Sequence, residues 1–145
     1  APLKSGCPQR SKREKMKILV VDDDAIVIKS CKRILEAEGL EVSTVPSADE
    51  ALEKIKTYEF DLLLIDVKMP KHDGMFLMRE ILKVIPDMPI VVMSGYPTPE
   101  TVSDVLKLGA AQFIPKPFRP DELVKAIRPV LQKILSKKSF PTGAG

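Results

Sequence analysis

The stretch that decides the fold is Phe60-Asp61-Leu62-Leu63-Leu64-Ile65-Asp66-Val67-Lys68-Met69-Pro70. Its apolar run, residues 62–65, is typical of a strand that is buried on both faces of a sheet. The run stops at the carboxylate of Asp66, and Pro70 lacks the amide hydrogen that a continuing strand needs. In an open parallel sheet, ligands bind just beyond the carboxyl ends of the strands. Asp66 is therefore expected at the edge of the sheet where the chemistry takes place.

Other apolar runs have the length of strands, and segments with helical periodicity separate them. Ser47 and Glu50 form a capping box, Thr98 caps a helix that begins with a proline, and Gly39 closes the first helix. Pro129 lies within the last helix and predicts a kink. The alternation predicts an α/β fold with a five-stranded parallel sheet covered by helices on both faces. We expect strands at 17–21, 41–45, 60–65, 89–93 and 112–115, and helices at about 27–39, 47–55, 74–84, 98–109 and 120–134.

The length and charge pattern predict one folded domain between two tails. A chain of 145 residues is long enough for a single domain with a core. Residues 1–15 hold five Lys or Arg against one Glu, and we expect them to be a disordered basic tail. This tail either is simply solvated or touches anionic partners. We expect the folded domain at 16–136 and a second disordered tail at 137–145. The chain has 23 basic and 20 acidic residues, and the two tails hold seven of the basic ones and one of the acidic ones. The part between the tails therefore has 16 basic and 19 acidic residues, and this mildly acidic balance argues against direct binding of nucleic acid.

Cysteine content and hydropathy predict the compartment. Cys7 and Cys31 are too few for a disulfide framework, so a reducing, cytoplasmic setting fits best. The sequence has no apolar run of about 18 residues and no signal-peptide pattern at its start. We therefore expect no contact with a membrane.

Polar residues follow four of the expected strands, at four distant places in the sequence. They are Asp22, Asp23, Asp66, Ser94 and Lys116. Because the carboxyl ends of parallel strands meet at one edge of the sheet, these side chains are expected to converge. Their convergence is the strongest functional signal in the sequence.

The chemistry of this set points to phosphoryl transfer. Three neighbouring carboxylates repel one another, so the site requires a cation, and hard oxygen ligands suit Mg²⁺. A carboxylate can also act as a nucleophile and form an aspartyl phosphate. Lys116 supplies an ammonium for phosphate oxygens, and Ser94 supplies a hydroxyl donor. We interpret Asp66 as the acceptor of a phosphoryl group.

Each residue also has a simpler explanation when it is taken alone. Residues 22–24 could cap the first helix, and Asp24 is expected to be a cap or to lie exposed. Ser94 could be an ordinary turn residue and Lys116 an ordinary surface lysine. Phe113 could be a core residue. Asp61 begins the same strand as Asp66 at the opposite edge, and we assign it no chemistry.

The pattern resembles the receiver domains of bacterial two-component response regulators, such as the chemotaxis response regulator. The resemblance runs from about Lys17 to Ile134. It rests on four segments in order: Val20-Val21-Asp22-Asp23, Asp66-Val67-Lys68-Met69-Pro70 with Asp73-Gly74, Ser94-Gly95, and Phe113-Ile114-Pro115-Lys116-Pro117-Phe118. It implies a flavodoxin-like (βα)5 sandwich with strand order 2-1-3-4-5.

The resemblance also implies roles for the acidic residues. Asp66 matches the phosphoacceptor, and Asp23 matches a direct ligand of Mg²⁺, with Mn²⁺ as an alternative metal. Asp22 acts on the metal mainly through water, and the backbone carbonyl of Lys68 is a further ligand. 

Three further residues take roles by the same resemblance. Lys116 matches the lysine on the phosphoryl group, Ser94 the switch hydroxyl and Phe113 the switch aromatic. The Lys116–Pro117 bond is expected to be cis, because Lys116 must turn back toward Asp66 directly after its strand.

The implied partners are a sensor histidine kinase or a histidine phosphotransfer protein as the phosphate donor. The signal is expected to leave through the surface of the helix at 98–109, the strand at 112–115 and the helix at 120–134, toward an output domain, a protein partner or a second copy in a phosphorylation-dependent homodimer. The chain is either a single-domain regulator or part of a longer one. As a receiver it catalyses its own phosphorylation and slow dephosphorylation but turns over no metabolite.

The alternative is a phosphatase of the haloacid dehalogenase type, which also uses an aspartate nucleophile and Mg²⁺. Residues Asp22-Asp23-Asp24 superficially supply its Asp-x-Asp motif. Ile26 departs from that motif, however, and the reading leaves Asp66 and Lys116 unexplained.

Overall fold

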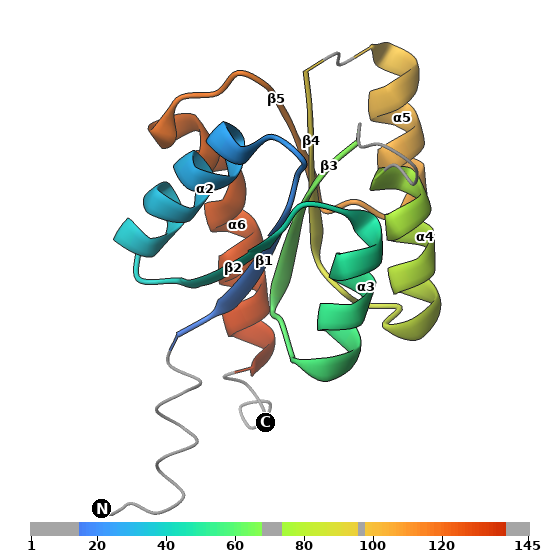
Figure 1. Cartoon of the computed structure of the whole chain (residues 1–145), viewed down its shortest axis with the longest axis horizontal. Coiled ribbons are helices and arrows are strands. Elements are labelled where there is room, and N and C mark those ends of the chain that lie inside the picture. Colours follow the sequence, from blue (N-terminus) through green and yellow to red (C-terminus); the bar gives the residue numbers. More distant parts are fainter. Residues whose placement is uncertain (1–14, 68–73, 96–97, 139–145) are drawn as a thin grey trace, which may run out of the picture.

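The computed structural model describes residues 15–67, 74–95 and 98–138. Within these residues, five strands alternate with five helices (Figure 1). The strands are β1 (Lys17–Val21), β2 (Glu41–Val45), β3 (Leu62–Asp66), β4 (Ile90–Ser94) and β5 (Gln112–Pro115). The helices are α2 (Ala25–Ala37), α3 (Ala48–Thr57), α4 (Gly74–Val84), α5 (Pro99–Leu108) and α6 (Pro120–Lys138).

The strands form one parallel sheet in the order β2-β1-β3-β4-β5. This confirms the predicted fold class and strand order. β3 lies at the centre, where Leu64 pairs with Val20 of β1 and with Val91 of β4. All five residues of β3 are buried, as its continuous apolar sequence requires of a strand covered on both faces.

Helices cover the two faces of the sheet and enclose two separate cores (Figure 1). α2 and α6 pack on one face, where Ile18, Leu64 and Ile127 belong to the same apolar cluster. α3, α4 and α5 pack on the other face, over a cluster that contains Leu63 and Leu77. Alternate residues of β3 therefore enter different cores, and the last residue of the strand is fixed at the edge between them.

The ends of several helices match the predicted caps. The side chain of Asp24 accepts hydrogen bonds from the first turn of α2, which confirms it as a cap. Ser47 accepts from the amide of Glu50, and Thr98 accepts from the amide of Thr101. These side chains satisfy amide groups that the helices leave unpaired at their starts.

α6 is longer than the sequence pattern predicts. It continues through the exposed Pro129 and ends at Lys138, two residues into the segment expected to be a tail. Residues 136–138 are polar, so they carry no periodic apolar signal, although nothing in them prevents a helix from continuing. The kink at Pro129 remains a prediction. The expectations for residues 1–14 and 139–145 lie outside the described residues.

Candidate metal centre at the carboxyl edge of the sheet

The strand ends bring together the polar residues that the sequence singles out. Asp22 and Asp23 directly follow β1, Asp66 is the last residue of β3, and Ser94 is the last residue of β4. Lys116 comes one residue after β5. Because all strands are parallel, these positions lie at the same edge of the sheet, opposite the beginning of β1 and the end of α6 (Figure 1).

The three carboxylates form a compact cluster. Asp22, Asp23 and Asp66 each offer one oxygen, and these oxygens lie within 4.8 Å of one another. Asp22 and Asp66 are buried, with exposed fractions of 0% and 2%, whereas Asp23 faces solvent. Burying like charges side by side is costly unless a cation compensates them. Oxygen ligands with one face open to water fit the preference of Mg²⁺, which keeps several of its waters.

Lys116 supplies part of the compensating charge. Its Nζ atom donates a hydrogen bond to Oδ2 of Asp22 at 3.1 Å and lies 3.4 Å from Oδ1 of Asp66. Its side chain is only 18% exposed. Burial acts to lower the pKa of Lys116, but the hydrogen bond to Asp22 and the charges of Asp66 and Asp22 outweigh it, so the pKa is raised above 10.5. Lys116 is therefore a firmly charged ammonium at neutral pH.

Both carboxylate oxygens of Asp22 accept hydrogen bonds from the protein. Oδ1 accepts from the backbone amide of Asp24 at 2.9 Å, and Oδ2 accepts from Lys116. Because both oxygens of Asp22 already accept hydrogen bonds from the protein, Asp22 is better suited to contact a metal through water than directly. Asp23 is the most accessible carboxylate of the cluster.

Gly74 explains how the chain passes so close to the end of β3. Its amide donates to the carbonyl of Val67 at 2.8 Å. A Cβ atom at this position would overlap the backbone carbonyl oxygen of Asp66 and lie 2.9 Å from the Cα of Val67. Only glycine permits this approach of α4 to the strand. The sequence shows Gly74 as part of a motif, but the packing reason for it requires the three-dimensional structure.

Ser94 and Phe113 lie on the neighbouring strands β4 and β5. Ser94 is 2% exposed, and its carbonyl accepts a hydrogen bond from the amide of Lys116 at 2.8 Å. Phe113 pairs in register with Val92 and is partly buried against the core formed with α3, α4 and α5. The Lys116–Pro117 bond is cis, as predicted.

Two expectations concern residues other than those of this cluster, Asp61 and Lys68. Asp61 lies at the opposite edge of the sheet, where its Oδ2 accepts the backbone amide of Lys17 at 2.8 Å, so its contact is structural. Lys68, whose carbonyl was expected to be a metal ligand, lies outside the described residues.

Fold and site together define an α/β protein with a cluster of three carboxylates and a lysine at the carboxyl edge of a parallel sheet. The sequence pattern of the family described as "Response regulator receiver domain" matches residues 18–128. This chain therefore belongs to the family of response regulator receiver domains. The match decides against a phosphatase of the haloacid dehalogenase type.

Similar sequences occur in a protein that the match covers almost completely and in longer proteins that it covers only in part. The chemotaxis protein CheY of Thermotoga maritima is 35% identical over 115 residues, which cover 79% of this chain and 96% of that protein. The C4-dicarboxylate transport transcriptional regulatory protein DctD of Rhizobium meliloti is 34% identical over 116 residues, 80% of this chain and 25% of that protein. The chain thus spans about a quarter of the length of DctD and of the similar ZraR proteins.

A solved structure shows the same fold. The CheY-like response regulator receiver domain protein from Methanospirillum hungatei JF-1 superposes with a TM-score of 0.80 and 36% sequence identity. The superposition covers 85% of this chain and 98% of that one. Separately, no helix among the described residues is long and apolar enough to cross a membrane.

Proposed function

We propose that Asp66 accepts a phosphoryl group from a phosphohistidine of a sensor kinase or a histidine phosphotransfer protein. The observation that carries this proposal is the convergence of three carboxylates and one ammonium at the carboxyl edge of the sheet. In the transfer, a carboxylate oxygen of Asp66 bonds to phosphorus while the donor's nitrogen–phosphorus bond breaks. The released imidazole keeps the electron pair and takes a proton from solvent, so no residue of this chain is needed as a general acid.

Asp23 and Asp66 are the residues suited to hold Mg²⁺ or Mn²⁺ directly, with Asp22 acting through water and Lys68 contributing its backbone carbonyl. The metal supplies positive charge against the oxygens of the transferring group. The cluster itself supports this assignment, because two of its carboxylates are removed from water. 

Lys116 is the residue placed to stabilise the product. It already touches a carboxylate oxygen of Asp66, the residue to be modified, and its ammonium can pair with phosphoryl oxygens after transfer. The attack adds negative charge at this point, so an ammonium held there by Asp22 is positioned before the reaction begins. Hydrolysis of the acyl phosphate by water then resets the site slowly.

The signal leaves through Ser94 and Phe113. Phosphorylation of Asp66 adds acceptor oxygens and charge, and the hydroxyl of Ser94 moves toward them. Space behind Ser94 is then filled by the ring of Phe113 from the adjacent strand. The two arrangements form the bistable element that a switch requires. The surface of α5, β5 and α6 changes as a result.

That surface is where we place the partners. DctD and ZraR, which are several times longer than the matched region, are transcriptional regulatory proteins. An output domain, a separate protein or a second copy of this chain can use the same surface. The domain itself does not bind nucleic acid directly, and it acts in the cytoplasm.

The test is phosphorylation by acetyl phosphate or a cognate kinase in the presence of Mg²⁺. Asp66→Asn is nearly isosteric but removes the nucleophile, so it should abolish labelling while the fold survives. Asp61→Asn is the matched control, because Asp61 directly precedes the same strand at the opposite edge of the sheet, and it should be labelled normally. Stoichiometric labelling of Asp66→Asn would show that the nucleophile is wrongly assigned.

A further inference from the structure

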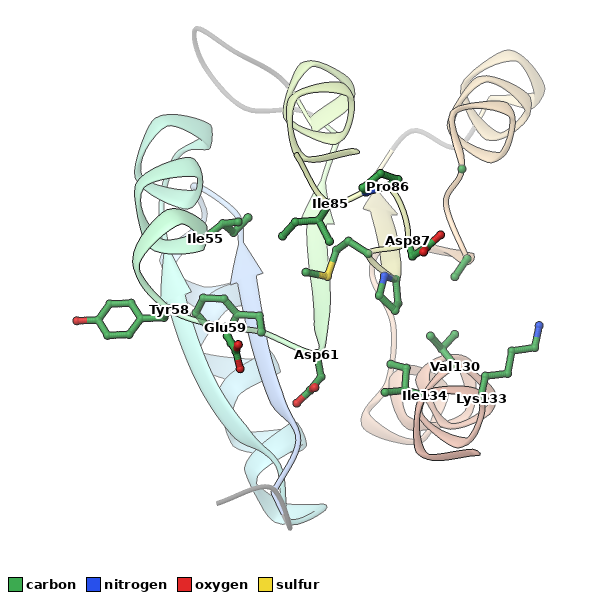
Figure 2. A pocket seen from close by; sticks show the side chains of 15 residues that line it. Ile55, Tyr58, Glu59, Asp61, Ile85, Pro86, Asp87, Val130, Lys133 and Ile134 are labelled. Carbon is green, nitrogen blue, oxygen red and sulfur yellow. The ribbon is translucent and has the colours of Figure 1, made fainter. Parts of the chain in front are cut away.

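A groove of about 730 Å³ lies at the amino edge of the sheet, opposite the carboxylate cluster (Figure 2). Its lining includes residues from α3, α6 and the segments before β3, β4 and β5. Ile55, Ile85 and Ile134 contribute apolar surface. The groove is independent of phosphorylation chemistry, because no residue of the candidate metal centre lines it.

The charged residues of the groove are mostly acidic. Glu59, Asp61 and Asp87 line it, against the single cation Lys133 among its described lining residues. Figure 2 shows Glu59 and Lys133 on opposite walls. Glu59 and Asp87 are exposed, so they are available to a ligand. An open groove lined by apolar side chains and by charged groups that are mostly acidic fits a basic peptide that also carries apolar residues.

Residues 1–14 of this chain have that composition. They contain Lys4, Arg10, Lys12 and Arg13 against Glu14, together with Leu3 and two prolines. The chain also enters the sheet at the groove, because the amide of Lys17 donates to Asp61, one of the lining residues. An extended chain spans about 3.3–3.6 Å per residue, so four to seven residues reach roughly 13–25 Å. The basic residues at 10–13 can therefore reach the groove, which the chain meets at Asp61.

We propose that this groove binds the basic N-terminal segment of the same chain, residues 1–14. The lysines and arginines of the segment face Glu59 and Asp87, and its apolar side chains contact the apolar lining residues Ile55, Ile85 and Ile134. Exposed ion pairs are individually weak and are screened by salt. Binding is therefore salt-sensitive, and its intramolecular character supplies the effective concentration that weak contacts need.

The chain contains a natural attachment point for a test in the intact protein. Cys7 lies in the segment, whereas Cys31 is fully buried and burial raises its pKa to about 12, so a thiol-reactive nitroxide attaches to Cys7. Paramagnetic broadening should then appear on backbone amides of the groove, at Tyr58, Asp87 and their neighbours. It should fall sharply in roughly 1 M NaCl, where the screening length is about 3 Å.

Two double variants that change the net charge by the same amount test the role of the two exposed acids Glu59 and Asp87. Glu59→Lys with Asp87→Lys should remove most of the broadening. Glu36→Lys with Asp104→Lys changes exposed acids outside the groove by the same total charge, and it should leave the broadening intact. Broadening that is absent, that is spread over the whole surface or that persists in the first double variant would overturn the proposal.

Two further labelling schemes exclude other occupants. A nitroxide at position 143, in the background Cys7→Ser with Gly143→Cys, reports on residues 139–145. Groove broadening from that position and none from Cys7 would assign the groove to the C-terminal segment instead. The second scheme mixes isotope-labelled chain that has no nitroxide with nitroxide-bearing chain that has no isotope label. If groove broadening in this mixture is as strong as in a chain that carries both labels, the groove binds the segment of a second copy. Either result would contradict binding within one chain.

Discussion

Gly74→Ala should destabilise the protein and disturb the candidate metal centre together. The added Cβ would meet only backbone: it overlaps the carbonyl oxygen of Asp66, lies 3.0 Å from the carbonyl carbon of Asp66 and lies 2.9 Å from the Cα of Val67. No side-chain rotation relieves such a contact, so the end of β3 or the start of α4 must move. Overpacking of this kind costs about 2 kcal/mol, and this cost exceeds any gain in helix propensity at the first position of α4.

Urea unfolding followed by circular dichroism measures this loss, with an unchanged m value as the sign that only stability has changed. For a domain of this size, about 2 kcal/mol corresponds to a fall of roughly 6 °C in Tm. Because Asp66 sits on the displaced segment, Mg²⁺ should also protect Gly74→Ala less than it protects the wild type.

Gly95→Ala is the matched control. A Cβ at Gly95 meets nothing within 4 Å, and Gly95 follows Ser94 at the same edge of the sheet. Its stability should stay within about 0.5 kcal/mol of wild type. If Gly74→Ala were equally neutral, the close approach of α4 to β3 would not be the reason for glycine at position 74.

Three other perturbations follow from the same geometry. Lys116→Met removes the ammonium that contacts the buried Asp22 and Asp66, so the free energy of unfolding should fall by about 3 kcal/mol without Mg²⁺ and by less with Mg²⁺. An equal loss in both conditions would contradict the idea that Lys116 and Mg²⁺ both offset the charge of the carboxylates. Burial and the charge of Asp22 raise the pKa of Cys31 from 9.0 to about 12. As the pH rises, the thiol therefore ionises in the unfolded state before it ionises in the folded state, and the free energy of unfolding declines between pH 9 and 12. The decline approaches about 1.4 kcal/mol per pH unit, and Cys31→Ala should lack that component in urea titrations at each pH. Beryllofluoride with Mg²⁺ should shift NMR resonances across residues 98–130 as well as near Asp66, and changes confined to the Asp66 pocket would refute the proposed switch while leaving the phosphorylation site intact.

The sequence was sufficient for the sheet because the evidence for it is local. Each strand is a short apolar run, and β3 reads as a strand buried on both faces because Leu62, Leu63, Leu64 and Ile65 are all apolar. The candidate site was predictable for a related reason. Once the strands are parallel, Asp22, Asp66 and Lys116 must lie at one edge, whatever the details of their contacts.

The features that the sequence does not reveal depend on several segments at once. The contact that requires glycine at position 74 involves the backbone of Asp66 and Val67, which becomes visible only when α4 is placed on the sheet. The groove at the amino edge combines Glu59, Asp87 and Lys133, which no spacing in the sequence connects. The hydrogen bonds that commit both oxygens of Asp22 likewise depend on the final position of Lys116.

The most direct test of the central claim is to locate the phosphoryl group chemically. An acyl phosphate is reduced by borohydride to an alcohol, which converts a phosphorylated aspartate into homoserine with a characteristic loss of mass. After treatment with acetyl phosphate and Mg²⁺, peptide mass spectrometry should find this change at position 66 and not at positions 22, 23 or 61. Conversion at any of those three positions, or at none while phosphate is still incorporated, would contradict Asp66 as the phosphoacceptor.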